Sequence, residues 1–479
     1  MHLAAFVTAG PGRPGGWRFP GSVPGWLSAG YYQNIARTLE DARFDLAFFA
    51  DILSVPDRFG GSPDSQLRNG ALGSMRLDPL HVLSSMGAVT SHLGLAATVS
   101  TTYAQPFTVA RSFATLDHLT EGRAAWNVVT SFQESEARNF NRDEQFPRDQ
   151  RYERADEFLE VAGKLWDSWE DDALVLDTEQ PLFADPDRVH PIRHKGDWFT
   201  VQGPLNVPRP PQGYPVVIQA GASAKGKDFA ARWSDVIFCS HASLESARDF
   251  YTEIKERAAT HGRNPDGVKI LPSVAPVVGA TSAIAQQTFE ELFDLVPPLG
   301  GLSTLAYHLD VDLSTFPLDE RLPDVEVPGV EGHYQEVKEM TEREGLTLRE
   351  LGKRYGGRVE GGFIGTATEV ADGLEEWFRQ GACDGFMVQA PYQPADSRTS
   401  PGRSFPSCRN EDCSAASTRG ARSARISGSL VCRVGSGPTG YVERPRPHGD
   451  CGRRGDFGRR AGVRAYRRRD AGALHPRCT

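Results

Sequence analysis

Apolar residues in the first 390 or so positions form two kinds of pattern, which alternate along the chain. Short, continuous apolar runs predict buried strands, and longer segments with apolar residues three or four positions apart predict helices. The predicted strands are 3–7, 46–51, 93–103, 124–129, 214–219, 236–240, 268–278 and 385–389. The predicted helices are 31–42, 79–91, 108–119, 151–169 and 369–380.

Strands that alternate with helices are typical of a parallel sheet with crossover helices. The eight strands therefore predict an α/β fold, a (β/α)8 TIM barrel, which we expect to occupy residues 1–392 as one domain. Three segments are too long for the connections of a plain barrel. We expect them to be insertions, at about 54–77, 176–214 and 280–355.

The composition is that of a globular protein with a large core, with 39% hydrophobic and 24% charged residues. No apolar run reaches the ~18 residues that a membrane span requires. The N-terminus lacks the basic and apolar regions of a signal peptide. Before residue 401 the only cysteines are Cys239 and Cys383. We therefore expect a cytoplasmic protein with neither a membrane segment nor a disulfide framework.

The C-terminal tail, residues 393–479, differs in composition from the rest of the chain. From Pro401 onward there are 17 Arg, no Lys and 6 acidic residues, so this part carries +11 and residues 1–400 carry −20. Without apolar periodicity, the tail is expected to be a disordered, low-complexity segment. We favour codons read in the wrong frame, which would explain the lack of Lys. A genuine basic tail, or a segment that binds nucleic acid or metal, stays open.

Three small polar residues stand at the end of the strand predicted at 124–129. Asn127 lies within the otherwise apolar run, and Thr130 and Ser131 follow the run. In an α/β barrel, ligands bind at the carboxyl ends of the strands. A buried Asn also needs a hydrogen-bond partner. Asn127 and Ser131 are therefore candidate ligand-binding residues.

A glycine-rich turn follows the fifth predicted strand and leads into a helix. Its backbone N–H groups and the helix dipole form a potential anion site, beside Ser223. Gly221, Gly226 and Lys227 have the spacing of a P-loop. However, Asp228 stands where Ser or Thr would bind magnesium, and its charge would repel a triphosphate. We interpret the turn as a site for a single phosphate, with a purely structural turn as the alternative.

Two more candidates lie at the ends of other strands. Asp51 closes an apolar run, where a carboxylate is costly unless it is hydrogen-bonded or faces the barrel mouth. A helix cap or a loop ion pair would also explain this residue. Thr98 shares a strand face with Ser100 and Thr102, which is a weaker signal because Thr is common in strands.

Arg148 and Tyr152 lie at the start of a predicted helix, where either side chain could bind a phosphate oxygen. A solvated, charged first turn is the alternative interpretation.

Two other function classes lack their motifs. Before the tail there is no G-x-S-x-G nucleophile elbow, whereas Gly10, Gly12 and Gly15 after the first predicted strand do have the spacing G-x-G-x-x-G. His190 and His194 are four residues apart, but Pro191 between them rules out the helix that would bring them together on a metal. The missing nucleophile elbow weighs against a serine hydrolase, and the placing of the two histidines weighs against a metal site.

Eight separate blocks, in order from Met1 to about Pro391, resemble one family. This family is the two-component flavin-dependent monooxygenases of the bacterial-luciferase superfamily. The nearest branch contains nitrilotriacetate monooxygenase component A, dibenzothiophene-sulfone monooxygenase and the pristinamycin synthase subunit. The blocks are 15–18, 44–51, 100–103 with Pro106, 110–118, 126–131, 151–152 with Ala155, 196–199, and 219–221 with Ser223.

The resemblance implies an enzyme that oxidises a small organic substrate with O2 through a flavin C4a-(hydro)peroxide. It implies reduced FMN as cofactor, supplied by a separate NAD(P)H:flavin oxidoreductase, and a homo-oligomer, with no nucleic-acid or membrane partner. Segments 54–77 and 280–355 are expected to form a lid that selects the substrate. The implied FMN contacts are Asp51, Thr98, Arg148, Tyr152 and Ser223, and we place Asn127 and Ser131 beside the flavin ring. The family commonly has His at the position of Arg148, so that contact stays open.

Two alternatives to an active monooxygenase remain from the sequence. One is a catalytically impaired FMN-binding barrel, because the altered tail replaces the C-terminal helix of the family. With GC-rich codons, 408–428 can be read one nucleotide back as a sequence that resembles that helix, and the gene sequence decides whether the codons allow it. The other is an unrelated barrel hydrolase. The sequence does not identify the substrate.

Overall fold

Eight parallel strands close into a barrel in the computed structural model, which describes residues 1–392 except Gly21, Val23, Pro24, Ala222, Ala242, Pro328 and Val330. Around the ring the strands follow the order of the chain, and each pairs in parallel with its two neighbours. They are β1 (His2–Thr8), β2 (Leu46–Ala50), β3 (Gly94–Ser100), β4 (Ala124–Val129), β9 (Val216–Gln219), β10 (Val236–Cys239), β11 (Lys269–Val274) and β14 (Gly385–Gln389). The predicted (β/α)8 barrel is confirmed. The predicted disordered tail, 393–479, lies outside the described residues.

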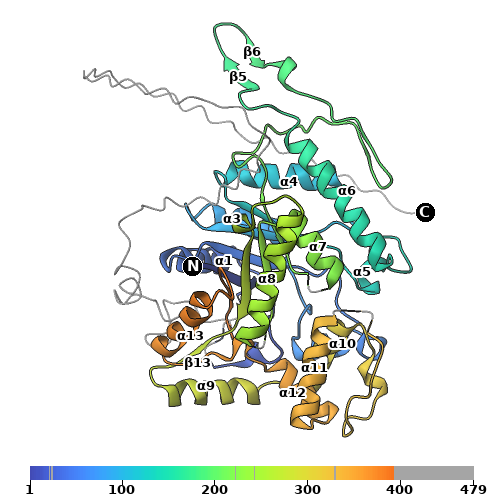
Figure 1. Cartoon of the computed structure of the whole chain (residues 1–479), viewed down its shortest axis with the longest axis vertical. Coiled ribbons are helices and arrows are strands. Elements are labelled where there is room, and N and C mark those ends of the chain that lie inside the picture. The colour runs from blue at the N-terminus through green and yellow to red at the C-terminus, as the bar shows by residue number, and fades with distance from the viewer. Residues whose placement is uncertain are drawn as a thin grey trace, which may run out of the picture. The chain divides into compact units, whose positions relative to one another are not determined.

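Helices connect the strands and cover the outside of the barrel (Figure 1). They are α1 (Ala29–Asp41), α3 (Pro79–Gly87), α4 (Pro106–Leu119), α6 (Arg148–Trp166), α7 (Ala224–Trp233), α8 (Leu244–Thr260) and α13 (Ala367–Arg379). The largest core lies between this layer and the strands, where the Trp126 ring packs against Phe113 and Phe158. Among the described helices, none combines the length and the apolar character that crossing a bilayer requires.

The interior of the barrel is apolar in its lower part and polar towards the carboxyl ends of the strands. The rings of Phe6, Phe48 and Phe238 pack against one another with centroids 5.1–5.9 Å apart, together with Ala96 and Ala125. Side chains alternate between the two faces of a strand. Thr98 and Asn127, two residues beyond Ala96 and Ala125, therefore point inward one layer higher.

Three long excursions leave this framework. The first, between β2 and α3, holds η2 (Phe59–Gly61) and α2 (Asp64–Asn69). The second, between β4 and β9, holds α5 (Glu134–Arg138), α6, β5 (Leu174–Asp177), β6 (Leu182–Ala184), η3 (Pro186–Arg188), β7 (His194–Lys195) and β8 (Thr200–Val201). The third, between β11 and α13, holds β12 (Val277–Val278), α9 (Ser282–Asp294), α10 (Pro298–Leu309), η5 (Leu313–Thr315), α11 (Glu331–Glu344), α12 (Leu348–Gly356), η6 (Glu360–Gly362) and β13 (Ile364–Gly365). Two further short turns are η1 (Gly16–Arg18) and η4 (Pro265–Gly267).

The third excursion forms a small cluster of helices beside the barrel, in which α10 and α12 pack around Leu305, Leu351 and Tyr355 (Figure 1). The expected insertions at 54–77, 176–214 and 280–355 coincide with parts of these excursions, whereas the domain limits at residues 1 and 392 stay a prediction.

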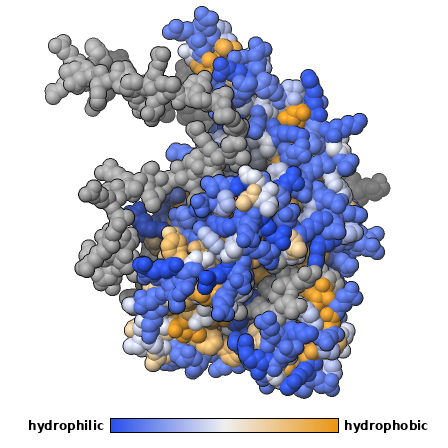
Figure 2. All heavy atoms as spheres, in the orientation of Figure 1, coloured by the Kyte–Doolittle hydropathy of each residue, from blue (hydrophilic) through white to orange (hydrophobic). Residues whose placement is uncertain are grey.

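One prediction of secondary structure was wrong in detail. The strand expected over 268–278 splits into β11 and β12, because Pro276 has no N–H to donate and β12 pairs with β13 outside the barrel. The segment expected at 176–214 to be an insertion contains most of the hairpin β5–β6 and all of the hairpin β7–β8. The β5–β6 hairpin stands clear of the barrel, and its exposed apolar side chains include Leu176 and Phe183 (Figures 1 and 2).

A buried carboxylate fixes the start of β4 to its surroundings. Asp117, at the end of α4, is fully buried and accepts hydrogen bonds from Ala124 N (3.1 Å) and from Gln212 through its backbone N (3.1 Å) and its side-chain Nε2 (2.5 Å). The entry to β4 thus depends on one side chain, and the polar residues at the other end of β4 depend on that entry.

We predict that Asp117→Ala lowers the stability by about 2–4 kcal/mol, because it removes three hydrogen bonds and leaves the buried Ala124 N and the partly buried Gln212 N without this acceptor. Thermal and urea unfolding of the full chain measure this loss. Thr115→Ala, on the exposed side of the same helix, serves as the control and should change stability by less than about 1 kcal/mol. Equal effects of the two substitutions would contradict this role of Asp117.

Candidate functional site

The predicted site residues lie at the carboxyl ends of four neighbouring strands or in the helices that follow them. Asp51 follows β2, Thr98 lies in β3, and Asn127 lies in β4. Ser131 follows β4, Arg148 and Tyr152 lie in the first turns of α6, and Ser223 precedes α7.

Thr98 and Asn127 form a hydrogen-bonded pair inside the barrel. The Thr98 hydroxyl donates to the Phe49 carbonyl at 2.7 Å and accepts from Asn127 Nδ2 at 2.8 Å. This arrangement orients the amide and leaves Asn127 Oδ1 buried without a hydrogen-bond partner among the described residues. Gln219, at the end of β9, has a buried side-chain oxygen in the same condition. Such atoms are costly to bury, so they indicate a ligand that donates hydrogen bonds.

The turn between β9 and α7 forms a narrow cradle at a helix N-terminus. Ser223 is the N-cap, and its hydroxyl accepts from Gly226 N at 3.2 Å. A side chain on Gly226 would bring its Cβ to 2.9 Å from the Tyr152 hydroxyl and 3.1 Å from Ser223 Oγ, so only glycine keeps this space clear. Tyr152, Ser223 and the free N–H groups of α7 therefore meet at one point, which suits a phosphate.

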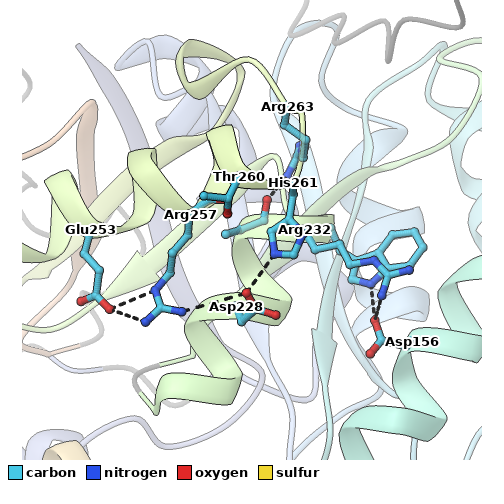
Figure 3. A network of polar contacts seen from close by, with 10 residues as sticks. Asp156, Asp228, Arg232, Glu253, Arg257, Thr260, His261 and Arg263 are labelled. Carbon is cyan, nitrogen blue, oxygen red and sulfur yellow. Dashed lines mark hydrogen bonds and ion pairs between the residues drawn. The ribbon is translucent and has the colours of Figure 1, made fainter.

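The two charged residues that resemble a P-loop face away from that cradle. Lys227 pairs with Glu253 of α8 at 2.7 Å. Asp228 pairs with His261, at the C-terminal end of α8, at 2.9 Å (Figure 3). The lysine that would contact a triphosphate is thus engaged elsewhere. The geometry therefore disfavours a nucleoside triphosphatase and assigns these residues to the packing of α7 on α8.

Ser131 and Arg148 have partners within the chain. Ser131 has a left-handed backbone with φ of 32°, and its hydroxyl donates to Ser100 Oγ at 3.0 Å. Its carbonyl accepts a short hydrogen bond from Arg151, and this contact holds the strained turn against α6. Arg148 Nη2 donates to the Gly329 carbonyl at 3.0 Å and so ties α6 to the third excursion.

Among the described residues, Asp51 is neither a helix cap nor part of an ion pair within 4.0 Å. Its carboxylate accepts a hydrogen bond from the next backbone N–H, Ile52 N, at 2.9 Å. Burial raises the pKa of Asp51 to about 7, and the charges of Asp78 and Glu136 act in the same direction. The Ile52 bond and the charge of Arg76 oppose this rise only in part. Asp51 is therefore a carboxyl group that exchanges its proton near neutral pH.

Sequence reasoning missed three residues that surround Asp51. Glu136 in α5 is 4% exposed and accepts from Leu53 N at 3.0 Å, and burial raises its pKa. Arg76 ends the first excursion, and Tyr307 lies in α10. The charge of Arg76 lowers the pKa of Asp51, and the charge of Asp51 raises the pKa of Tyr307. No local pattern marks them, although the excursions that carry Arg76 and Tyr307 were expected to form the lid.

Most of the chain, residues 6–384, matches the family model described as luciferase-like monooxygenase. The chain belongs to this family. It is 46% identical over 404 residues to the dibenzothiophene-sulfone monooxygenase of Rhodococcus erythropolis (strain XP), a match that covers 82% of this chain and 89% of the relative. It is 41% identical to nitrilotriacetate monooxygenase component A of Aminobacter aminovorans, a match that covers 79% of this chain and 85% of the relative.

Among solved structures, the fold is similar to that of riboflavin lyase (RcaE) with modified FMN and the substrate riboflavin. The TM-score is 0.75 and the identity 32%, and the match covers 82% of this chain and 88% of the lyase. The expected enzyme class, a flavin-dependent monooxygenase, and the expected branch of the family are confirmed by the sequence matches. The contacts of individual residues with a flavin stay predictions.

We predict that Asp51 makes the stability of this monooxygenase depend on pH. The pKa of an unfolded Asp is about 3.9, so between about pH 4 and pH 7 the folded protein keeps a proton that the unfolded chain releases. Stability should therefore fall as pH rises through this window, by an amount on the order of 1–2 kcal/mol after allowance for partial exposure. In Asp51→Asn this contribution is absent.

The measurement is the thermal midpoint of the wild type and of Asp51→Asn at several values between pH 5 and pH 8. The variant should gain on the wild type as pH rises. Parallel profiles would show that Asp51 ionises in the folded protein as it does in water.

Proposed function

We propose that this monooxygenase takes reduced FMN from a separate NAD(P)H:flavin oxidoreductase and uses O2 to oxidise a small organic substrate. The observation that carries the proposal is the buried amide oxygen Asn127 Oδ1, which points into the barrel and has no hydrogen-bond partner among the described residues. A flavin pyrimidine edge has the donor that such an oxygen needs.

The phosphate is proposed to bind the cradle at α7, where Ser223 caps the helix and the Tyr152 hydroxyl lies beside Gly226. Asn127 would hold the pyrimidine edge of the ring through its free Oδ1. Thr98 then acts through the amide that it orients.

The remaining predicted contacts, Asp51, Ser131 and Arg148, are proposed to line the edge of the flavin site. Asp51 is suited to hold or release a proton near neutral pH. Ser131 and Arg148 already have partners in the chain, so we expect them to shape the site more than to bind the cofactor.

Bound reduced FMN would supply the reactivity towards O2, and the chain orients it and excludes water. The structural basis for exclusion is the contact between the first and third excursions across the mouth. Gln66 Nε2 donates to the Ser303 carbonyl at 3.0 Å, and Arg58 pairs with Asp310 at 2.6 Å. These contacts are proposed to close the lid over the substrate.

A second protein is part of the proposal. One relative is named as component A of a monooxygenase, which supports a partner component here. We propose that this partner is the flavin reductase and that the monooxygenase itself is a homo-oligomer.

We predict that Ser223→Ala and Asp51→Ala each weaken the binding of reduced FMN, Ser223→Ala by roughly ten- to a hundredfold because a charge-assisted hydrogen bond to phosphate is lost. Anaerobic titration with reduced FMN measures the dissociation constant. Ser243→Ala is the matched control, since Ser243 caps α8 with an N–H···O bond of the same 3.2 Å length. It should lose a similar amount of stability and bind reduced FMN normally. Unchanged affinity in both site variants would remove these assignments.

We predict that O2 consumption with a flavin reductase rises when the true substrate is present, and that an oxygen atom from O2 appears in the product. A screen of sulfones, amines and carboxylic acids with ¹⁸O2 and mass spectrometry provides the measurement. Binding of FMN with only hydrogen peroxide as product would instead indicate the impaired barrel. No binding of flavin in any redox state would end the proposal.

A further inference from the structure

Two hydrogen bonds hold Arg76 at the barrel mouth, one from the backbone of the next residue and one from the Arg76 side chain. Leu77 N donates to the Ala9 carbonyl at 3.0 Å, and Arg76 Nη1 donates to the Pro11 carbonyl at 2.8 Å. A Cβ on Gly10 would stand 2.0 Å from the Met75 carbonyl oxygen, so the close approach of these two segments depends on glycine. The position of the guanidinium is therefore fixed by the fold.

The rest of the guanidinium is buried without a partner. Nε and Nη2 make no hydrogen bond, and no carboxylate of the described chain lies within 4.0 Å of them. Burial lowers the pKa of Arg76 to about 10, so the group stays charged at neutral pH. A buried charge with two unused donors is costly unless a ligand satisfies it.

These two nitrogens have the geometry that recognises paired oxygens. Nε and one Nη of an arginine form a planar fork, which donates two parallel hydrogen bonds to a carboxylate or a similar group. Such a ligand would accept hydrogen bonds from Arg76 Nε and Nη2, the two nitrogens that have no acceptor among the described residues.

The titratable groups that act electrostatically on Arg76 come from three different parts of the chain. Asp51 follows β2, Tyr32 lies in α1, and Tyr307 lies in α10, and each acts electrostatically on the guanidinium. Asp78 and Glu136 act on Asp51 in turn. Asp51 keeps its proton up to about pH 7, which limits its repulsion of an anion beside Arg76.

We propose that Arg76 binds an oxygen-bearing anionic group of the substrate, a carboxylate or a sulfonate, through its Nε and Nη2 atoms. The inference rests on the proposed function. It assigns the subsite to the substrate because Arg76 and Tyr307 come from the two excursions that meet over the mouth. The atoms proposed to hold the flavin come from β4, α6 and the start of α7. An electron-rich oxygen of the reduced flavin has the same chemistry, and the experiment separates the two sources.

Calorimetric titration of the full-length protein, saturated with reduced FMN under anaerobic conditions, tests the proposal. The probes are succinate and methanesulfonate, each with an uncharged counterpart, succinamide and dimethyl sulfone. The wild type should bind the anions more tightly than the neutral probes. Arg76→Met should weaken anion binding by roughly ten- to a hundredfold, the range for loss of a charge-assisted pair of hydrogen bonds, and should leave the neutral probes unaffected. Arg76→Lys, which keeps the charge, should lie between the two.

Arg58→Met is the matched control, because Arg58 belongs to the same excursion but already pairs with Asp310. This variant should bind the anions as the wild type does. Anion binding that is absent in the wild type, or equally weakened in both variants, would overturn the proposal. Loss of reduced-FMN affinity in Arg76→Met, with no effect on the anions, would assign the guanidinium to the flavin instead.

Titration of the anions without flavin separates this inference from the proposed function. If reduced FMN does not bind but the anions still bind through Arg76, the flavin site fails and the anion subsite stands. Circular dichroism and thermal midpoints of both Arg76 variants show whether they fold.

Discussion

All eight barrel strands run in the same direction, and this constraint governs the rest of the molecule. Because the strands are parallel, their carboxyl ends meet at one rim, and the inward-pointing polar side chains placed there face the same space. The aromatic rings of Phe6, Phe48 and Phe238 fill the barrel below. The Thr98 hydroxyl of β3 and the Asn127 amide of β4 lie above this layer, where a ligand can reach them.

The rim stores unfavourable electrostatic energy. Glu136 and Arg151 are buried there and Asp51 and Arg76 are partly buried, and the pKa values of all four shift in the directions that favour the neutral forms. Desolvation of an ion costs several kcal/mol, while an exposed pair such as Lys164–Glu160 contributes about 0.3–0.5 kcal/mol. Surface ion pairs therefore do not offset the desolvation cost of the charged groups at the rim. The apolar core between helices and strands supplies the stability that allows a strained site.

The sequence predicted the framework because each strand carries its own signal. The runs at 124–129 and 385–389 became β4 and β14 with the same limits. It failed where a contact between distant segments decides the outcome. The hairpins β5–β6 and β7–β8 form within a Pro-rich segment that has no alternation. Arg76 could not be singled out from the sequence, because its position depends on contacts with Gly10 and Pro11. Pro11 lies 65 residues before Arg76 in the chain. The candidate site was predictable only where its residues lie beside a local sequence pattern. Asn127 and Ser223 stand next to strong local patterns, whereas Tyr307 and Glu136 do not.

The central claim is that the rim of this barrel binds a reduced flavin with its phosphate at the start of α7. A crystal structure of the protein soaked anaerobically with reduced FMN tests it most directly. The account predicts the phosphate beside Ser223 and Tyr152, and the pyrimidine edge within hydrogen-bond distance of Asn127 Oδ1. A rim without flavin, with Asn127 and Ser223 turned into packed protein, would contradict it.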